Sequence, residues 1–141
     1  MPKSLKYSAR SQEMRTGNNM FNRRKRVVYM HPHDIDLFYY WGVTNYGRTP
    51  PYRGIPLDDQ TIKKLGFAYY KLESDRNGTF VTYDLPGFRI LHNRDRNLFY
   101  LSFFIKNDFL NHWIPLKEVL FVHQVQNLIF ELSGTMINLK K

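Results

Sequence analysis

The sequence predicts an α+β protein with a small antiparallel sheet or partly open barrel packed against a C-terminal helix, a short helix near residues 58–65 and a basic N-terminal arm. Three observations lead to this prediction. Strand-like aromatic and aliphatic runs alternate with turn residues through the middle of the chain. An apolar pattern of helical period follows near the C-terminus. Most of the net charge of +9 lies at the N-terminal end.

The arm is defined by charge. Residues 1–26 hold eight Lys and Arg side chains against Glu13 alone, whereas the remaining residues hold 13 basic and 11 acidic side chains. The first stretch has little apolar periodicity, so we expect a flexible arm over 1–26 and a single α+β domain over 27–141. A localised basic segment on a nearly neutral body favours binding to a polyanion.

After the arm, Val27–Tyr29 is typical of a strand. The aromatic run 34–41 fits a second strand or a short helix, and its length does not decide between them. Residues 45–54 contain two consecutive prolines and are predicted to form a loop. This loop carries Arg48 and Arg53.

The short helix has clear boundary signals. Asp58 or Asp59 can cap its start, Lys63 and Lys64 fall in its last turn, and Gly66 can end it. Strands are then predicted over 67–72, 80–85, 88–92 and 98–105, with turns at 75–78 and 93–97. The second turn carries Arg94 and Arg96.

The last helix is predicted over Leu116–Ser133. Its apolar stripe consists of Val122, Val125, Ile129 and Leu132. Gly134 is expected just beyond its end, and residues 135–139 could return as an edge strand.

Two sequence blocks carry a family resemblance. They are Ile-Pro-Leu-Asp-Asp-Gln-Thr-Ile-Lys-Lys-Leu-Gly-Phe, ending at Phe67, and Phe-Val-His-Gln-Val-Gln-Asn-Leu-Ile-Phe-Glu-Leu-Ser-Gly, ending at Gly134. Together with a looser block over 13–18, they resemble a widespread family of short, uncharacterised proteins. Members of that family are encoded in genomes, prophages and mobile elements of gut-associated anaerobic bacteria.

The resemblance implies a small α+β fold with a C-terminal helix and a phage or mobile-element ancestry. It carries over no activity. The chain departs from the family pattern in the basic residues 3–10 and 23–26, so its particular function is expected to lie there.

Several classes of protein are disfavoured by the sequence. It has no cysteine, which excludes disulfides, thiolate metal sites and cysteine nucleophiles. No signal-like segment or apolar run long enough to span a bilayer is present, so we expect a cytoplasmic protein without membrane contact. No phosphate-binding loop, nucleophile motif or paired carboxylates are visible. We therefore expect a protein that is not an enzyme and has no cofactor.

Two histidine motifs have a structural and a functional interpretation. His31 and His33 on one strand face could chelate a metal, but the metallohydrolase spacing is broken and a polar turn is favoured. His123, Gln124, Gln126 and Asn127 could form a binding face on the last helix. Satisfaction of buried backbone groups is the favoured interpretation.

The predicted function is binding of RNA or a ribonucleoprotein by a mobile-element accessory protein. Its concrete version is an inhibitor of a host nucleic-acid machine, similar to an anti-CRISPR protein. The predicted contacts combine guanidinium groups with nearby aromatic side chains. They are Arg10, Arg15, Arg23, Arg24, Lys25, Arg26, Arg48, Arg53, Arg94 and Arg96. The alternatives are a virion assembly component, and a protein–protein module that binds an acidic surface or a host nuclease complex.

Overall fold

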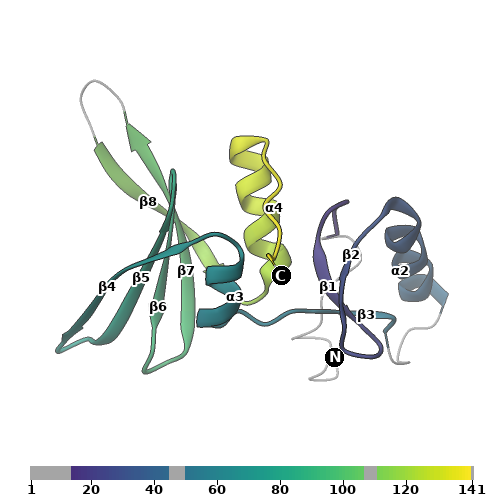
Figure 1. The fold of residues 1–141 in the computed structure, drawn as a ribbon, viewed down its shortest axis with the longest axis horizontal. Coiled ribbons are helices and arrows are strands. Elements are labelled where there is room, and N and C mark those ends of the chain that lie inside the picture. The colour runs from purple at the N-terminus through teal and green to yellow at the C-terminus, as the bar shows by residue number, and fades with distance from the viewer. Residues whose placement is uncertain (1–13, 45–49, 107–110, 141) are drawn as a thin grey trace. The chain divides into compact units, whose positions relative to one another are not determined.

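The computed structural model describes residues 14–44, 50–106 and 111–140. The chain forms two compact units (Figure 1), of which unit 1 comprises Met1–Pro56 and Phe121–Asn138, and unit 2 comprises Leu57–Leu120 and Leu139–Lys141. The predicted α+β class is confirmed. The described strands form one three-stranded and one five-stranded antiparallel sheet, and neither sheet closes into a barrel.

Unit 1 contains three short strands and two helices. In chain order these are β1 (Asn19–Asn22), β2 (Val27–Tyr29), α2 (Pro32–Thr44), β3 (Tyr52–Gly54) and α4 (Val122–Ser133). The strand order is β2-β1-β3. A cluster of Met14, Met20 and Met30 forms its core, and Ile35 of α2 and Tyr52 of β3 pack against this cluster.

The structure divides the chain differently from the predicted boundary at residue 26. Residues 1–13 lie outside the described residues, but Met14 and Met20 are buried and Asn19–Asn22 is a strand. Residues 23–26 form the turn between β1 and β2. The stretch is mostly polar and charged, so its few apolar side chains gave no periodic signal in the sequence. Their burial nevertheless fixes the backbone.

The aromatic run after β2 is a helix. Pro32 is the first residue of α2, where its missing N–H removes no helical hydrogen bond. The carboxylate of Asp34 accepts a hydrogen bond from the backbone N–H of His31 at 3.0 Å. These contacts stabilise a helix start, so His31 and His33 precede and open α2 and do not form a strand face.

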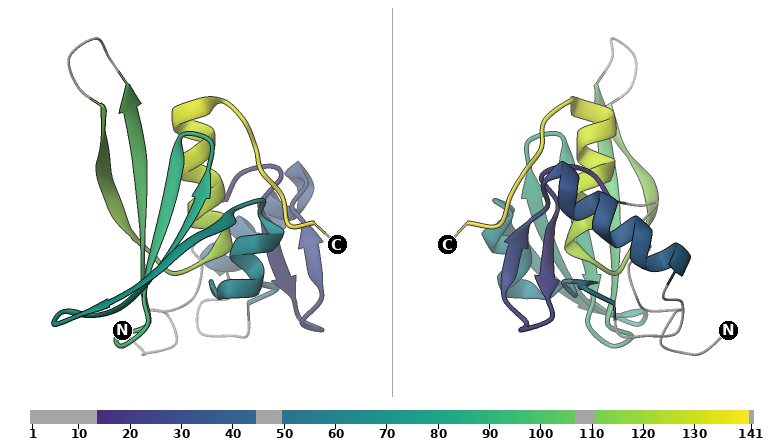
Figure 2. Two further views of the ribbon diagram at one scale, coloured as in Figure 1. Left: turned by 60° about the vertical axis from the view of Figure 1, so that its left-hand side comes forward. Right: turned by 90° about the vertical axis from the view of Figure 1, so that its right-hand side faces the viewer.

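Unit 2 is a meander of five antiparallel strands preceded by one short helix (Figure 2). Its elements are α3 (Asp59–Lys64), β4 (Ala68–Asp75), β5 (Gly78–Leu85), β6 (Phe88–Asn93), β7 (Leu98–Lys106) and β8 (Asn111–Val119). The strands pair in sequence order, which confirms the four predicted strands and both predicted turns.

The short helix begins as predicted. Thr61 donates its backbone N–H to the carboxylate of Asp58 at 2.7 Å, and the backbone N–H of Asp58 donates to the Thr61 hydroxyl at 2.9 Å. This is a reciprocal capping box. Gly66 then adopts a φ of 106°, which favours glycine.

The start of the last helix was predicted too early. Leu116–Val119 belongs to β8, an unpredicted strand that pairs with β7 through contacts such as Leu101↔Lys117. Pairing with a neighbouring strand overrides the local helical pattern here. The helix α4 begins at Val122, after Phe121 donates its backbone N–H to the Gln124 side chain at 3.1 Å.

The helix end was predicted correctly, because Gly134 adopts a left-handed conformation with φ of 75°. The segment 135–139 is not a strand. Its Ile137 carbonyl accepts a hydrogen bond from the Gln126 side chain at 2.7 Å, so a side-chain amide holds the tail. None of the helices in the described ranges is long and apolar enough to cross a bilayer.

Candidate functional site

The most basic feature of unit 1 is the turn between β1 and β2. Its four residues Arg23, Arg24, Lys25 and Arg26 are all exposed. The Asn22 side-chain oxygen accepts hydrogen bonds from the backbone N–H groups of Arg24 at 2.9 Å and Arg26 at 3.0 Å. The turn backbone is therefore held by Asn22.

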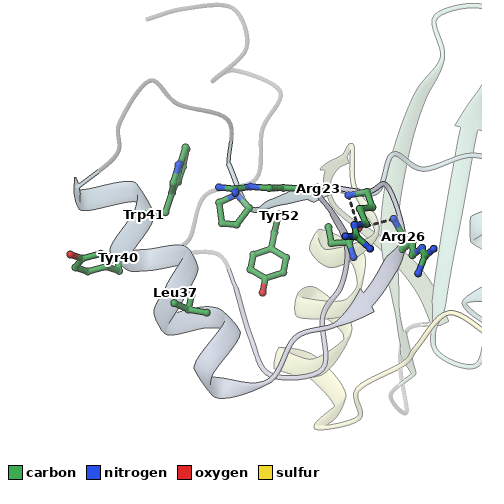
Figure 3. A pocket seen from close by; sticks show the side chains of 9 residues that line it. Arg23, Arg26, Leu37, Tyr40, Trp41 and Tyr52 are labelled. Carbon is green, nitrogen blue, oxygen red and sulfur yellow. Dashed lines mark hydrogen bonds between the residues drawn. The ribbon is translucent and has the colours of Figure 1, made fainter.

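Aromatic and apolar side chains of α2 and β3 face this turn across a groove of about 560 Å³ (Figure 3). Its lining consists of Asn22, Arg23, Arg24, Arg26, Leu37, Tyr40, Trp41, Pro51 and Tyr52. Figure 3 shows Leu37, Tyr40 and Trp41 on α2, Arg26 on the turn away from this helix, and Arg23 extending from the turn toward α2. None of these lining residues carries a carboxylate, so the groove combines cationic and aromatic side chains.

The helical wall is unusually apolar for an exposed surface. Leu37 is 56% exposed and Tyr40 is 64% exposed. The indole Nε1–H of Trp41 is buried and has no acceptor among the described residues. Spacing at i, i+3 and i+4 places Leu37, Tyr40 and Trp41 on one face of α2.

Tyr52 connects the groove to the helix start. Its ring stacks on Phe38 with centroids 5.7 Å apart, and its hydroxyl donates to the Asp34 carboxylate at 2.7 Å. Burial and this hydrogen bond raise the pKa of Tyr52 to about 12. Burial opposes ionisation of Asp34, but hydrogen bonds from His31 and Tyr52 outweigh it and lower its pKa. The Asp34 charge is thus already engaged beside the groove.

The remaining predicted contact residues lie elsewhere. Arg15 forms an ion pair with Glu131 at 2.7 Å and lies over the Phe130 ring. Arg53 is an exposed β3 residue opposite Phe21. Arg10 and Arg48 lie outside the described residues. Of the predicted residues in unit 1, the structure therefore brings Arg23, Arg24 and Arg26 together in the groove.

The two predicted arginines of unit 2 sit in the turn between β6 and β7. Arg96 is exposed, whereas Arg94 lies 3.5 Å from the Asp59 carboxylate. Asp59 also accepts a hydrogen bond from the Tyr83 hydroxyl at 2.6 Å, which lowers the pKa of Asp59. His92 lies 3.4 Å from the same carboxylate and stacks on Phe99. We interpret these contacts as structural, because Tyr83 and Arg94 hold the Asp59 carboxylate within the fold of unit 2.

A further arginine of unit 2 is fully engaged. Arg89 forms two hydrogen bonds with the Asp84 carboxylate, at 2.7 and 3.0 Å. Its guanidinium also lies over the rings of Tyr70 and Trp113, with the nearer centroid at 4.3 Å. A hollow of about 400 Å³ lies beside Asp84 and Trp113. Because the Arg89 guanidinium is already bound to Asp84, it is not available to a ligand in this hollow.

The helix motif of the resemblance forms a buried amide network. Gln126 accepts a hydrogen bond from the Asn19 backbone at 2.9 Å and donates to the Asn19 side chain at 2.9 Å. Asn18 donates to Asn127 at 2.8 Å. His123 is buried and stacks on Phe121. A buried structural role fits this geometry, but Gln126 is the side chain shown to satisfy backbone groups, at Asn19 and Ile137, in place of the expected His123 and Asn127.

All three resemblance blocks contribute residues to unit 1. Asn18 of the looser block contacts α4 through Asn127, and the Ile55 carbonyl accepts a hydrogen bond from the Val122 N–H at 2.9 Å. Within unit 1, residues of all three blocks thus belong to α4 or contact it, and none of them lines the groove. Among the described residues, no group of three or more His, Cys, Asp or Glu side chains is arranged to hold a metal.

Comparisons of the chain with protein-family models, with curated proteins and with solved structures found no match. The argument for function therefore depends on the groove itself.

The groove was only partly predictable. The basic run 23–26 was predicted as a binding element. The α2 wall was missed, although the spacing of Leu37, Tyr40 and Trp41 would have indicated a common face once a helix was assumed.

Proposed function

We propose that this protein is a non-enzymatic binder of RNA or of a ribonucleoprotein, acting through the β1–β2 turn. One observation carries the proposal: the turn has four exposed cationic side chains, and three of them line a groove that also contains exposed Tyr40 and half-buried Trp41 and has no lining carboxylate. Guanidinium groups bind phosphates with directed hydrogen bonds, and aromatic rings stack on unpaired bases.

The charge distribution supports the same proposal. Unit 1 has ten basic and four acidic residues in sequence, a net charge of +6, whereas unit 2 has 11 basic and eight acidic residues, a net charge of +3. In unit 2, Arg89 and Arg94 lie against carboxylates. Within the described ranges, no ion pair joins Arg24 or Arg26 to a carboxylate, so these cations are available to a polyanion.

The biological setting of the proposal comes from the sequence resemblance. An accessory protein of a mobile element that binds RNA in the host cytoplasm can block or divert a nucleic-acid machine, as an anti-CRISPR-like inhibitor would. Affinity capture from host lysate, with and without nuclease treatment, distinguishes this role from binding to an acidic protein. Loss of the captured partner after nuclease treatment is the expected result.

The direct test is the salt dependence of RNA binding, measured by fluorescence anisotropy with a labelled ten-nucleotide oligouridylate. If the four basic side chains of the turn each neutralise one phosphate, log K falls with log salt at a slope of about −3. Replacing Arg23, Arg24 and Arg26 by Gln should reduce the slope to about −1. Deletion of residues 1–26 is unsuitable, because it removes β1 and two core methionines.

A matched control removes the same charge from unit 2. Arg76, Lys106 and Lys117 are exposed there, and their replacement by Gln should leave the slope near that of the native protein. Equal losses in both variants would show that binding follows net charge alone. Absence of binding by the native protein at low salt would refute the proposed function.

A further inference from the structure

We infer that the groove is a stacking site for one unpaired base of single-stranded RNA, with Tyr40 as the stacking side chain and the turn arginines on the flanking phosphates. This inference depends on the proposed function and specifies its ligand. It states which part of the nucleic acid enters the groove and predicts a preference for single strands over duplexes.

The chemistry of the groove supports a nucleotide in particular. An acidic peptide would use Arg23, Arg24 and Arg26, but its carboxylates gain nothing from an aromatic surface. A nucleotide carries both an anionic phosphate and a flat base. The groove brings guanidinium groups and aromatic rings together, which matches these two parts.

The size of the groove agrees with this ligand. Its volume of about 560 Å³ lies within the range of roughly 300–1,000 Å³ that is typical of small-molecule sites. Tyr40 is 64% exposed, so a base can reach its ring. Tyr52, which also lines the groove, is held by stacking on Phe38 and by its hydrogen bond to Asp34.

Duplex RNA does not offer the same contacts. Its bases are paired and stacked on one another, so only phosphates and groove edges can reach the protein. The turn would still attract a duplex through charge, but Tyr40 would gain no stacking contact. We therefore expect single-stranded and duplex RNA to share the salt-dependent contribution of the phosphate contacts. The contribution of stacking on Tyr40 should occur only with single strands.

The inference is tested with two ten-nucleotide probes of equal charge, an oligouridylate and the same backbone without bases. The native protein should bind the base-bearing probe about tenfold more tightly, which corresponds to about 1.4 kcal/mol. Tyr40→Ala should abolish this preference and leave the salt slope unchanged. Tyr39→Ala is the matched control, because Tyr39 is an exposed neighbour on α2 that does not line the groove.

The intrinsic fluorescence of Trp41 gives a second readout. Trp113→Phe removes the other tryptophan, so the remaining signal comes from the groove. The base-bearing probe should quench or shift this emission more strongly than the probe without bases. Circular dichroism of each variant confirms that the fold is retained.

The outcomes separate this inference from the proposed function. Equal, salt-dependent binding of both probes by the native protein would overturn the stacking site and leave RNA binding intact. Absence of binding to either probe would overturn both. Binding of a ten-residue polyglutamate as tightly as the oligouridylate, insensitive to Tyr40→Ala, would assign the groove to an acidic protein instead.

Discussion

Arginine side chains have different contacts in the two units. In unit 2, Arg89 is held by a carboxylate and by two aromatic rings, and Arg94 lies beside Asp59. In unit 1, the turn presents exposed Arg24 and Arg26 in a groove that also contains exposed Tyr40. Similar residue types therefore stabilise the fold in one unit and form a candidate binding surface in the other. The number of arginines alone does not identify a binding site.

The largest expected effect concerns the core of unit 1. Gln126→Leu leaves the Asn19 backbone N–H and the Ile137 carbonyl without their buried partner. We expect the free energy of unfolding to fall by about 3 kcal/mol, because each orphaned buried group costs about 1–3 kcal/mol. Urea denaturation measures this change.

Leu132→Ala on the same helix is the control for that variant, because Leu132 is exposed and should change stability by less than about 0.5 kcal/mol. Hydrogen exchange adds a regional readout. Gln126→Leu should reduce protection in β1 and α4 more than in the unit 2 sheet. Equal loss of protection in both units would contradict the expectation that each unit unfolds as a separate cooperative region.

A smaller effect tests the contrast between arginines. Arg89→Gln loses the paired hydrogen bonds to Asp84 and the contact with Trp113, and we expect a loss of about 1–2 kcal/mol. The triple Gln variant of the turn should change stability by less than about 0.5 kcal/mol. Thermal or urea unfolding of the two variants measures both values, and similar losses would remove the distinction drawn between the units.

The smallest effect is a dependence on pH. The pKa of Asp34 is lower in the folded protein than its ordinary value of 3.8, so its stabilising contribution is present above that value and is lost as pH falls through the folded pKa. Tyr52→Phe should lower the free energy of unfolding by about 1 kcal/mol near neutral pH. This difference should diminish as the pH falls through the lowered pKa of Asp34, because the carboxylate is then protonated.

Tyr83→Phe is the matching variant in unit 2. It removes the hydrogen bond to Asp59, whose pKa is lowered by this bond despite an opposing effect of burial. Asp59 is more exposed than Asp34, so solvent screening should make the loss smaller than for Tyr52→Phe. Urea unfolding at neutral and acidic pH compares the two variants. If the loss of unfolding free energy caused by either substitution grew at acidic pH, the stabilising hydrogen bond to an ionised carboxylate would be contradicted.

Local signals determined much of the secondary structure. Asp58 and Thr61 form the predicted cap region of α3, and Gly134 ends α4 because left-handed backbone favours glycine. The turn at 93–97 was readable from its polar residues. Each of these features depends on contacts within a few residues, and the sequence displays such contacts directly.

Tertiary structure decided the rest. The helix predicted from Leu116 begins only at Val122, because β7 offers a hydrogen-bonded partner to the residues before it. Burial of Met14 and Met20 turns part of the predicted arm into a strand and a hairpin. The sequence by itself determined that residues 23–26 are cationic. Only the fold placed Arg23, Arg24 and Arg26 in one groove with Tyr40 and Trp41, because separate segments of the chain meet through the packing of a core that charge patterns do not reveal.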